Sequence, residues 1–365
     1  MQARLSAAGI PQITVVHGSA TAGGAYQPGL SDYVIMIRNQ STVYLAGPPL
    51  LKAATGEIAT DEEIGGAEMH SEVSGVADFI AQSDADGIRI AREVTQMLNW
   101  NKDFSEATTP CDVAPVYTSD ELLGIVPKDA KTPFDVREVI ARIVDRSELM
   151  EFKELYGPTL VCGWAYIHGY PVGILANNGV LFSESAVKGA HFIGLCNQRQ
   201  IPLLFLQNIT GFMVGVDAER GGIARHSAKL VYAMATARVP RLTVIIGGSY
   251  GAGNYGMCGR GFAPNFLFAW PNARIATMSP EIASSVLTDL RRASLKGEGS
   301  EAEIEAIRAR THAQFEQQSD PYYATARLWD DGILEPADTR EVIGLCLALA
   351  AALPPNTGPS PVFRM

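Results

Sequence analysis

The sequence predicts an α/β protein made of two homologous units, the first of which is N-terminally incomplete. Two observations support this fold class. A stretch near the N-terminus recurs in the second half of the chain, and each copy reads as a short apolar strand, a turn rich in glycine and alanine, and a helix. Continuous apolar strands of this kind are typical of sheets that are covered on both faces, as in α/β folds.

The internal duplication aligns residues 10–26, IPQITVVHGSATAGGAY, with residues 239–255, VPRLTVIIGGSYGAGNY, without a gap. A second match follows in each unit, STVYLAGPP in the first and NARIATMSP in the second. Self-similarity in a fixed order indicates a repeated structural unit. Many more alternating strands and helices precede the second copy than the first. We therefore expect a truncated chain or a mis-assigned start, and an unpaired apolar edge on the sheet of the first unit.

The predicted domain organisation follows from this repeat. Residues 1–105 are expected to form the C-terminal half of the first domain, and residues 131–365 the second domain. Residues 106–130, together with their flanks, are rich in Pro, Asp, Thr and Lys, a composition typical of a linker between domains.

Composition restricts the class of protein. With 365 residues, of which 47% are apolar, the chain can bury a large core. Its 39 acidic and 29 basic residues give a net charge of -10, which argues against nucleic acid or an anionic membrane as a partner. No apolar stretch is long enough for a bilayer, and the start does not read as a signal peptide. The protein is therefore expected in the cytoplasm.

Cysteines and histidines show no metal-binding pattern. The five cysteines are scattered without a CxxC pair, which favours a reducing compartment over a disulfide framework. The six histidines lack the spacing of metal ligands, so no metal site is expected.

The two glycine turns are the candidate sites of chemistry. A strand that ends in small residues and opens a helix leaves main-chain N–H groups directed at whatever lies beyond the turn. Such groups stabilise oxyanions, and two turns suggest two of them. A dinucleotide fingerprint, Gly251-x-Gly253-x-x-Gly256, is formally present, but no acidic residue follows at the required distance and the first copy does not keep the spacing. A purely structural alternative is that the glycines only permit tight packing.

Several long motifs occur in order along the whole chain: HGSATAGGAYQPGLSD, YLAGPPLLKAATGE, NNGVLFSESAVKGAHFI, QNITGFMVG, IIGGSYGAGNYGMCGR and WPNARIATMSPE. Together they resemble the β subunits of methylcrotonoyl-CoA and geranyl-CoA carboxylases, which are biotin-dependent carboxyltransferases. The resemblance implies the crotonase (ClpP/crotonase-like) ββα-superhelix fold. It also implies acyl-CoA on the N-terminal domain and biotin on the C-terminal domain of a neighbouring subunit.

The resemblance assigns roles to individual residues. The amides around Ala22, Gly23 and Gly24 would hold the thioester oxygen, and those of Ala252 and Gly253 the ureido oxygen of biotin. The other expected biotin contacts are Gly211, Phe212, Gly251 and Tyr255; the other expected acyl-CoA contacts are Ala20, Tyr26, Gly29, Ala46, Gly47 and Lys52. For Phe212, Tyr26 and Tyr255, packing in the core is the alternative. For Lys52, and for Arg38, simple solvation is the alternative.

The implied activity is transfer of CO2 from carboxybiotin to the γ carbon of a branched enoyl-CoA, in acyclic terpene or leucine catabolism. No biotin-attachment sequence or ATP-binding domain is present in the sequence. Biotin is therefore expected on a partner α subunit with biotin carboxylase and carrier domains. An α6β6 assembly, with coenzyme A as part of the substrate, is implied by the family.

The substrate is predicted from the first turn. Methylcrotonoyl-type subunits read MGSCTAGGAYVPAMAD there, whereas this chain has Ala20 and Gly29 in place of Cys and Ala. Smaller side chains leave a deeper pocket, so geranyl-CoA is favoured over 3-methylcrotonoyl-CoA. Two alternatives of another class remain, namely a biotin-independent crotonase-type hydratase or isomerase and an inactive fragment.

Overall fold

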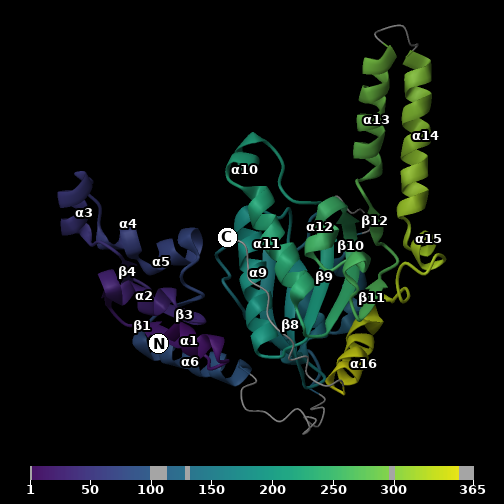
Figure 1. Ribbon diagram of the computed structural model, residues 1–365. Helices are drawn as coiled ribbons and strands as arrows, with labels where there is room; N and C mark the ends of the chain where they lie inside the picture. Colours follow the sequence, from purple (N-terminus) through teal and green to yellow (C-terminus); the bar gives the residue numbers. More distant parts are fainter. Residues whose placement is uncertain (1, 99–112, 128–131, 296–300, 353–365) are drawn as a thin grey trace.

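The computed structural model describes residues 2–98, 113–127, 132–295 and 301–352 (Figure 1). Of the predicted linker, residues 106–112 and 128–130 lie outside the described residues. Residues 113–127 form η3 (Ser119–Glu121) and α7 (Leu122–Ile125), and Leu122 is fully buried in a core of the second unit. The predicted domain boundaries stay a prediction.

The first unit carries two small parallel sheets, with strand orders β1-β3-β5 and β2-β4. Its elements in chain order are α1 (Gln2–Ala7), β1 (Ile13–Val16), β2 (Ser19–Thr21), η1 (Ala22–Ala25), α2 (Tyr26–Gly29), β3 (Tyr33–Ile37), β4 (Thr42–Tyr44), α3 (Pro48–Thr55), α4 (Asp61–Gly65), α5 (Ala67–Met69), η2 (His70–Ser74), β5 (Phe79–Ala81) and α6 (Asp84–Met97).

The second unit is built on a seven-stranded mixed sheet of order β11-β10-β9-β8-β7-β6, with β12 pairing to β10. Its elements are α8 (Val136–Ile143), η4 (Asp145–Ser147), β6 (Met150–Glu151), β7 (Leu160–Ile167), β8 (Tyr170–Asn177), α9 (Ser183–Gln198), β9 (Leu203–Ile209), α10 (Val216–Arg220), α11 (Ile223–Thr236), β10 (Arg241–Tyr250), α12 (Gly251–Gly256), η5 (Arg260–Phe262), β11 (Phe266–Ala269), β12 (Arg274–Ala276), α13 (Pro280–Leu295), α14 (Glu301–Ser319), α15 (Pro321–Thr325), η6 (Pro336–Asp338) and α16 (Thr339–Ala351).

The strand pairings confirm the internal duplication. When the two units are aligned, the single strand β10 corresponds to β1 and β2 together. Strand β11 corresponds to β3, and β12 corresponds to β4. The parallel pair β1-β3 recurs as β10-β11, and β2-β4 recurs as β10-β12. On its other side β10 pairs with β9, whereas β1 has only β3 as a strand partner among the described residues. The expected unpaired edge of the first sheet is therefore present.

Two of the four hydrophobic core clusters among the described residues are large and hold the molecule together. One covers the face of the large sheet that carries α8 and α16, which fits the continuous apolar runs of β7, β9 and β10. The other extends from α9 and β7 of the second unit to β3 and α6 of the first unit. Aromatic contacts cross the junction, with ring centroids 5.9 Å apart for Tyr33 and Trp164 and 6.5 Å apart for Phe79 and Phe152. The units thus share a core rather than only a linker.

A buried ion pair also joins the two units. The ammonium of Lys153 lies 2.5 Å from a carboxylate oxygen of Asp78, and both side chains are almost inaccessible to solvent. Lys153 also donates a hydrogen bond to the carbonyl of Gly75, and Asp78 accepts one from the amide of Val34 at 2.7 Å. These polar contacts fix the loop between η2 and β5 against the second unit.

We predict that replacing Lys153 by methionine lowers the free energy of unfolding by about 3–5 kcal/mol, because the carboxylate of Asp78 is then buried without a counter-charge. The double variant Lys153→Met/Asp78→Asn should lose less than the sum of the two single losses. Chemical denaturation of the four proteins measures this. Losses that simply add would contradict a direct pair.

Candidate functional site

The first glycine turn follows β2 and forms the short helical segments η1 and α2. Ala22 adopts a left-handed conformation, with φ of 53°, which turns the chain sharply at the end of the strand. The preceding residue, Thr21, makes no capping hydrogen bond with its side chain. Since the first N–H groups of a helical segment have no partner within it, the amides of Gly23 and Gly24 are available to a ligand. A methyl group added at either glycine would meet no atom within 4 Å.

Strand β4 brings further predicted residues to this turn. Ala20 pairs with Val43 in the β2-β4 ladder, and β4 also contacts η1. Ala46 and Gly47 follow β4 directly, and Gly47 precedes α3. A methyl group on Gly47 would lie 3.1 Å from the ring of Tyr44, so glycine is needed there for close packing.

Two basic residues and one glycine complete the predictions for the first unit. Lys52 is exposed on α3. The guanidinium of Arg38 lies 2.7 Å from a carboxylate oxygen of Glu68. Arg38 therefore forms an ion pair within the first unit. Gly29 ends α2, is exposed, and has open space around it.

The second glycine turn repeats the geometry of the first. Gly251, the residue matched to Ala22, is also left-handed, with φ of 56°. Tyr250, at the end of β10, makes no side-chain capping bond, so the amides of Ala252 and Gly253 at the start of α12 have no partner within the helix. Here the glycine is also needed for packing, because a methyl group on Gly253 would lie 2.5 Å from the Cδ1 atom of Ile209.

The predicted biotin contacts Gly211 and Phe212 lie beside α12. The carbonyl of Gly211 accepts a hydrogen bond from the amide of Leu181 at 3.1 Å, and Leu181 forms an isolated bridge with Phe212. A methyl group added to Gly256 would lie 3.2 Å from the ring of Phe212. The ring is half-buried and packs against the core that the two units share. Phe212 therefore combines core packing with a place next to the turn.

The two tyrosines next to the turns are not core residues. Tyr26 is 57% exposed and Tyr255 is 53% exposed, so the core-packing alternative is wrong for both. Among the described aromatic pairs Tyr255 contacts only Phe262, which is partly buried, at 5.6 Å between centroids. Both rings are free to cover a ligand.

A buried polar network behind the second turn escaped the sequence analysis. The hydroxyl of Ser249 donates to the side-chain oxygen of Gln207 at 2.6 Å and accepts from the side-chain amide of Asn254 at 2.7 Å. Gln207 in turn donates to the carbonyl of Met257 at 2.6 Å. The network ties Asn254 of α12, and Met257 directly after this helix, to β9 and β10. Its signal in the sequence was the pair of amides, QN, at the end of an otherwise apolar strand.

The two turns lie well apart in the folded molecule. The first is in the small unit at the left of Figure 1, and the second lies beyond α9 and α11 at the end of β10. Each turn gathers its own set of predicted residues.

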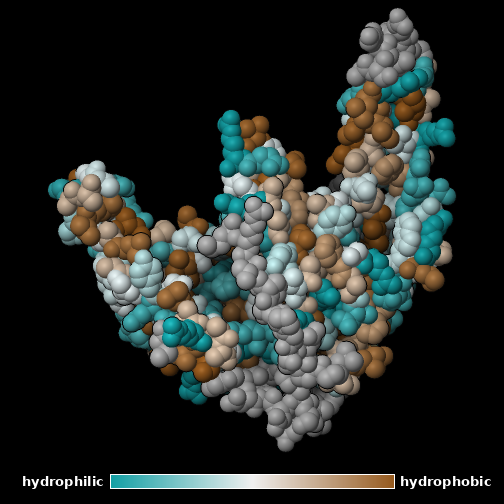
Figure 2. Space-filling model, viewed as in Figure 1, coloured by the Kyte–Doolittle hydropathy of each residue, from teal (hydrophilic) through white to brown (hydrophobic). Residues whose placement is uncertain are grey.

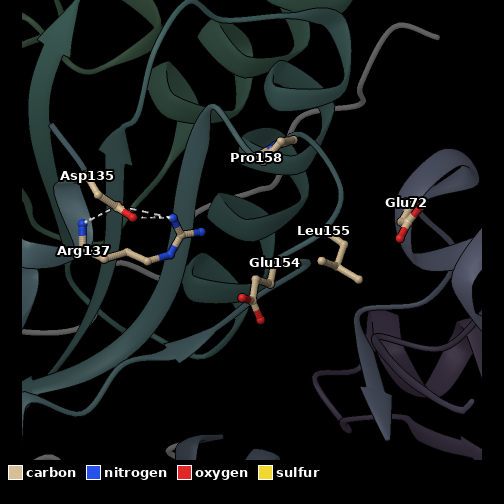
Figure 3. Close-up of a pocket in the computed structure, with 6 residues that line it drawn as sticks. All are labelled: Glu72, Asp135, Arg137, Glu154, Leu155 and Pro158. Carbon is tan, nitrogen blue, oxygen red and sulfur yellow. Dashed lines mark hydrogen bonds and ion pairs between the residues drawn. The ribbon is translucent and has the colours of Figure 1, made fainter. Parts of the chain in front are cut away.

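A cavity of about 530 Å³ lies elsewhere, at the junction of the two units. Its lining consists of Glu72 from the first unit and of Asp135, Arg137, Glu154, Leu155 and Pro158 from the second (Figure 3). The guanidinium of Arg137 is already engaged, at 2.6 Å from Glu151 and 3.3 Å from Asp135. None of these residues belongs to the predicted site.

Other reactive groups are not arranged for catalysis in the part of the chain that the structure describes. Its four cysteines are free and buried, and burial raises the thiol pKa of Cys162 to about 12 and of Cys258 to about 11. No group of three or more His, Cys, Asp or Glu side chains is placed to hold a metal ion there. Among the same residues, no helix is long and apolar enough to cross a membrane.

Comparison with known proteins places the chain in a family. The sequence model of the family described as the carboxyl transferase domain matches residues 1–364. The chain is 56% identical over 376 aligned positions to the biotin-dependent 3-methylcrotonyl-coenzyme A carboxylase beta1 subunit of Mycobacterium tuberculosis, covering 100% of the chain and 69% of that protein. The chain spans 63% to 69% of the length of the five curated relatives that share at least 52% of its residues.

Two solved structures share the fold. Transcarboxylase 12S, solved as a hexamer with hydrolysed methylmalonyl-coenzyme A, overlaps with a TM-score of 0.88 at 35% identity and covers 100% of this chain and 70% of its own. The β subunit of geranyl-CoA carboxylase from P. aeruginosa overlaps with a TM-score of 0.63 at 49% identity, over 100% of this chain and 69% of its own. The predicted crotonase-like fold and the predicted resemblance are confirmed. The chain belongs to the carboxyl transferase family of the biotin-dependent acyl-CoA carboxylases.

Proposed function

We propose that this chain is the carboxyltransferase part of a biotin-dependent acyl-CoA carboxylase that carboxylates the γ carbon of a branched enoyl-CoA. The observation that carries the proposal is the repeated geometry of the two turns. At matched positions each turn has a left-handed residue, Ala22 or Gly251, followed by amides that lack a helical partner. We assign residues 1–105 to the C-terminal half of the acyl-CoA domain, residues 106–130 to a linker and residues 131–365 to the biotin domain.

The first turn suits the thioester of the acyl-CoA. Removal of the γ-proton spreads negative charge onto the thioester oxygen, and main-chain N–H groups that are already oriented stabilise such a charge without reorganisation. The amides of Gly23 and Gly24 are so placed, and the space around both glycines is open for the oxygen to approach. Ala20, Tyr26, Gly29, Ala46 and Gly47 surround this turn and would line the acyl group, and Lys52 would face the phosphates of coenzyme A.

The second turn suits the urea ring of biotin. The amides of Ala252 and Gly253 would donate to the ureido oxygen, and Gly211, Phe212, Gly251 and Tyr255 would flank the ring. Carboxybiotin, when bound, supplies both the CO2 and the base that takes the γ-proton. The protein then has to hold two oxyanions and exclude water.

The assignment of acyl-CoA to the first turn and biotin to the second also indicates which partner proteins are needed. We propose that biotin arrives on a partner α subunit and that β subunits associate with one another, as α6β6, because the two turns of one copy lie apart. Apolar side chains gather on the projecting hairpin α13–α14, as Figure 2 shows, and Ile282, Val286, Leu287 and Leu290 of α13 are exposed. Such a surface is typical of a protein interface. We place the enzyme in the cytoplasm, where buried free thiols remain reduced.

For the substrate we propose geranyl-CoA, with 3-methylcrotonoyl-CoA as the second candidate. Ala20 and Gly29 remove side-chain volume beside the first turn, and the space at Gly29 is open. The second candidate is favoured by sequence similarity, since the chain is 56% identical to the mycobacterial 3-methylcrotonyl-coenzyme A carboxylase subunit and 49% identical to the geranyl-CoA carboxylase subunit.

The test is a carboxylation assay with bicarbonate, ATP and the biotinylated α partner. We expect incorporation of labelled carbonate into an enoyl-CoA only when the partner is present. Turnover without it would support a hydratase or isomerase instead, and no turnover of either substrate would support an inactive fragment. A higher kcat/KM for geranyl-CoA is expected, and an equal or better value for the five-carbon substrate would reverse the order of the candidates.

A second prediction separates binding from packing at the two turns. Gly24→Val should abolish acyl-CoA binding while leaving the thermal unfolding temperature unchanged, because the added side chain enters open space. Gly253→Ala should cost about 1–3 kcal/mol of stability, because its methyl group overlaps Ile209. Gly124→Val, in open space on α7 and outside both turns, is the control and should change neither. Normal acyl-CoA binding by the Gly24 variant would contradict the assignment of the first turn.

A further inference from the structure

One histidine of the first unit is bonded through both ring nitrogens. His70 begins the π-helical turn η2 and is 7% exposed. Its Nε2 atom lies 2.6 Å from the carbonyl oxygen of Val43, and its Nδ1 atom lies 2.6 Å from the hydroxyl of Ser74. Because π-helical turns within proteins occur frequently at functional sites, this short segment is a candidate for a functional role.

The partners fix the state of the ring. A carbonyl oxygen only accepts hydrogen bonds, so Nε2 carries the hydrogen and donates to Val43. In the neutral ring Nδ1 is the acceptor for the hydroxyl of Ser74, which also lies 3.5 Å from the carbonyl oxygen of His70. Burial lowers the pKa of His70 although the bond to Val43 opposes this, which is consistent with a neutral ring.

The carbonyl that His70 holds belongs to the strand beside the first turn. Val43 lies in the centre of β4 and pairs with Ala20 of β2, the strand that leads into Ala22. Strand β4 is also approached closely from α4, since a methyl group on Gly65 would lie 2.6 Å from the same carbonyl oxygen. β2-β4 is a two-stranded sheet of three residue pairs, so it has few main-chain bonds of its own.

The other end of the π-helical turn is held by the second unit. Gly75, which follows Ser74, has its carbonyl bonded to Lys153, and a methyl group added to Gly75 would lie 3.0 Å from the ring of Tyr156. His70 therefore stands between a fixed anchor on the second unit and the strand that supports the first turn.

We propose that His70 is a positioning residue for acyl-CoA, which holds β4, and through it β2 and the first turn, in the geometry that binds the thioester oxygen. This inference rests on the proposed function and names a residue that acts through the main chain of Val43. His70 does not touch the substrate in this account. Its loss should weaken the acyl-CoA site and leave the biotin site unchanged.

Glutamine and asparagine substitutions at His70 separate the effect of the contact at Nε2 from that of the contact at Nδ1. The side-chain nitrogen of Gln reaches the position of Nε2, so His70→Gln keeps the donor to Val43. His70→Asn reaches only the position of Nδ1 and loses that donor. Ser74→Ala removes only the partner of Nδ1. His191→Asn is a control outside β4, since the ring of His191 is exposed on α9 and packs on Phe152, with 5.2 Å between the ring centroids.

The measurements are the dissociation constants for geranyl-CoA and 3-methylcrotonoyl-CoA, by calorimetry, and the KM values for acyl-CoA and biotin in the full chain with its biotinylated partner. We expect His70→Asn to raise the acyl-CoA constants about tenfold, as for the loss of one buried hydrogen bond, with the KM for biotin unchanged. His70→Gln and Ser74→Ala should stay within about twofold of the wild type. His191→Asn should leave the acyl-CoA constants unchanged.

Equal effects of the two His70 variants, or a parallel rise in the KM for biotin, would overturn the inference while leaving the proposed function in place. Unchanged acyl-CoA constants in His70→Asn would overturn it as well. A wild-type chain that binds acyl-CoA but transfers no carboxyl group would contradict the proposed function alone. A wild-type chain that binds neither geranyl-CoA nor 3-methylcrotonoyl-CoA would contradict both the inference on His70 and the proposed function.

Discussion

Main-chain N–H groups at the start of a helix have no carbonyl partner within that helix, and the structure uses this constraint twice. A left-handed residue, Ala22 in one unit and Gly251 in the other, ends a strand and directs the following amides away from the sheet. Glycine accepts this conformation readily, whereas alanine carries a steric cost. That an alanine adopts it at the matched position indicates that the surrounding β2-β4 pair imposes the turn.

The two units support their turns by different means. The second turn stands at the end of a ten-residue inner strand of a large sheet, and Gln207, Ser249 and Asn254 bond to one another beneath it. The first turn stands on a sheet of two short strands, so its geometry depends on neighbours such as His70 and the Lys153–Asp78 junction. This asymmetry explains why Gly253 is fixed by packing whereas Gly23 and Gly24 have open surroundings.

The sequence predicted the repeat, the two turns and the α/β class, because these depend on local patterns: apolar runs, small residues and fixed spacing. It did not predict the core that both units share, because the contact of Phe79 with Phe152 joins residues far apart in the chain. Nor did it reveal the hydrogen bonds of His70, since a single histidine has no spacing to compare. Whether Tyr26 and Tyr255 are buried or exposed also depended on tertiary packing, and both proved exposed.

Amide hydrogen exchange, read by mass spectrometry on peptides of the full chain, tests the central claim most directly. The account predicts that an enoyl-CoA slows exchange in the peptide that contains Gly23 and Gly24, and that biotin slows exchange in the peptide that contains Ala252 and Gly253. Each ligand should leave the other turn unchanged. Protection by both ligands at the cavity around Glu72 and Arg137, with no change at either turn, would contradict the account.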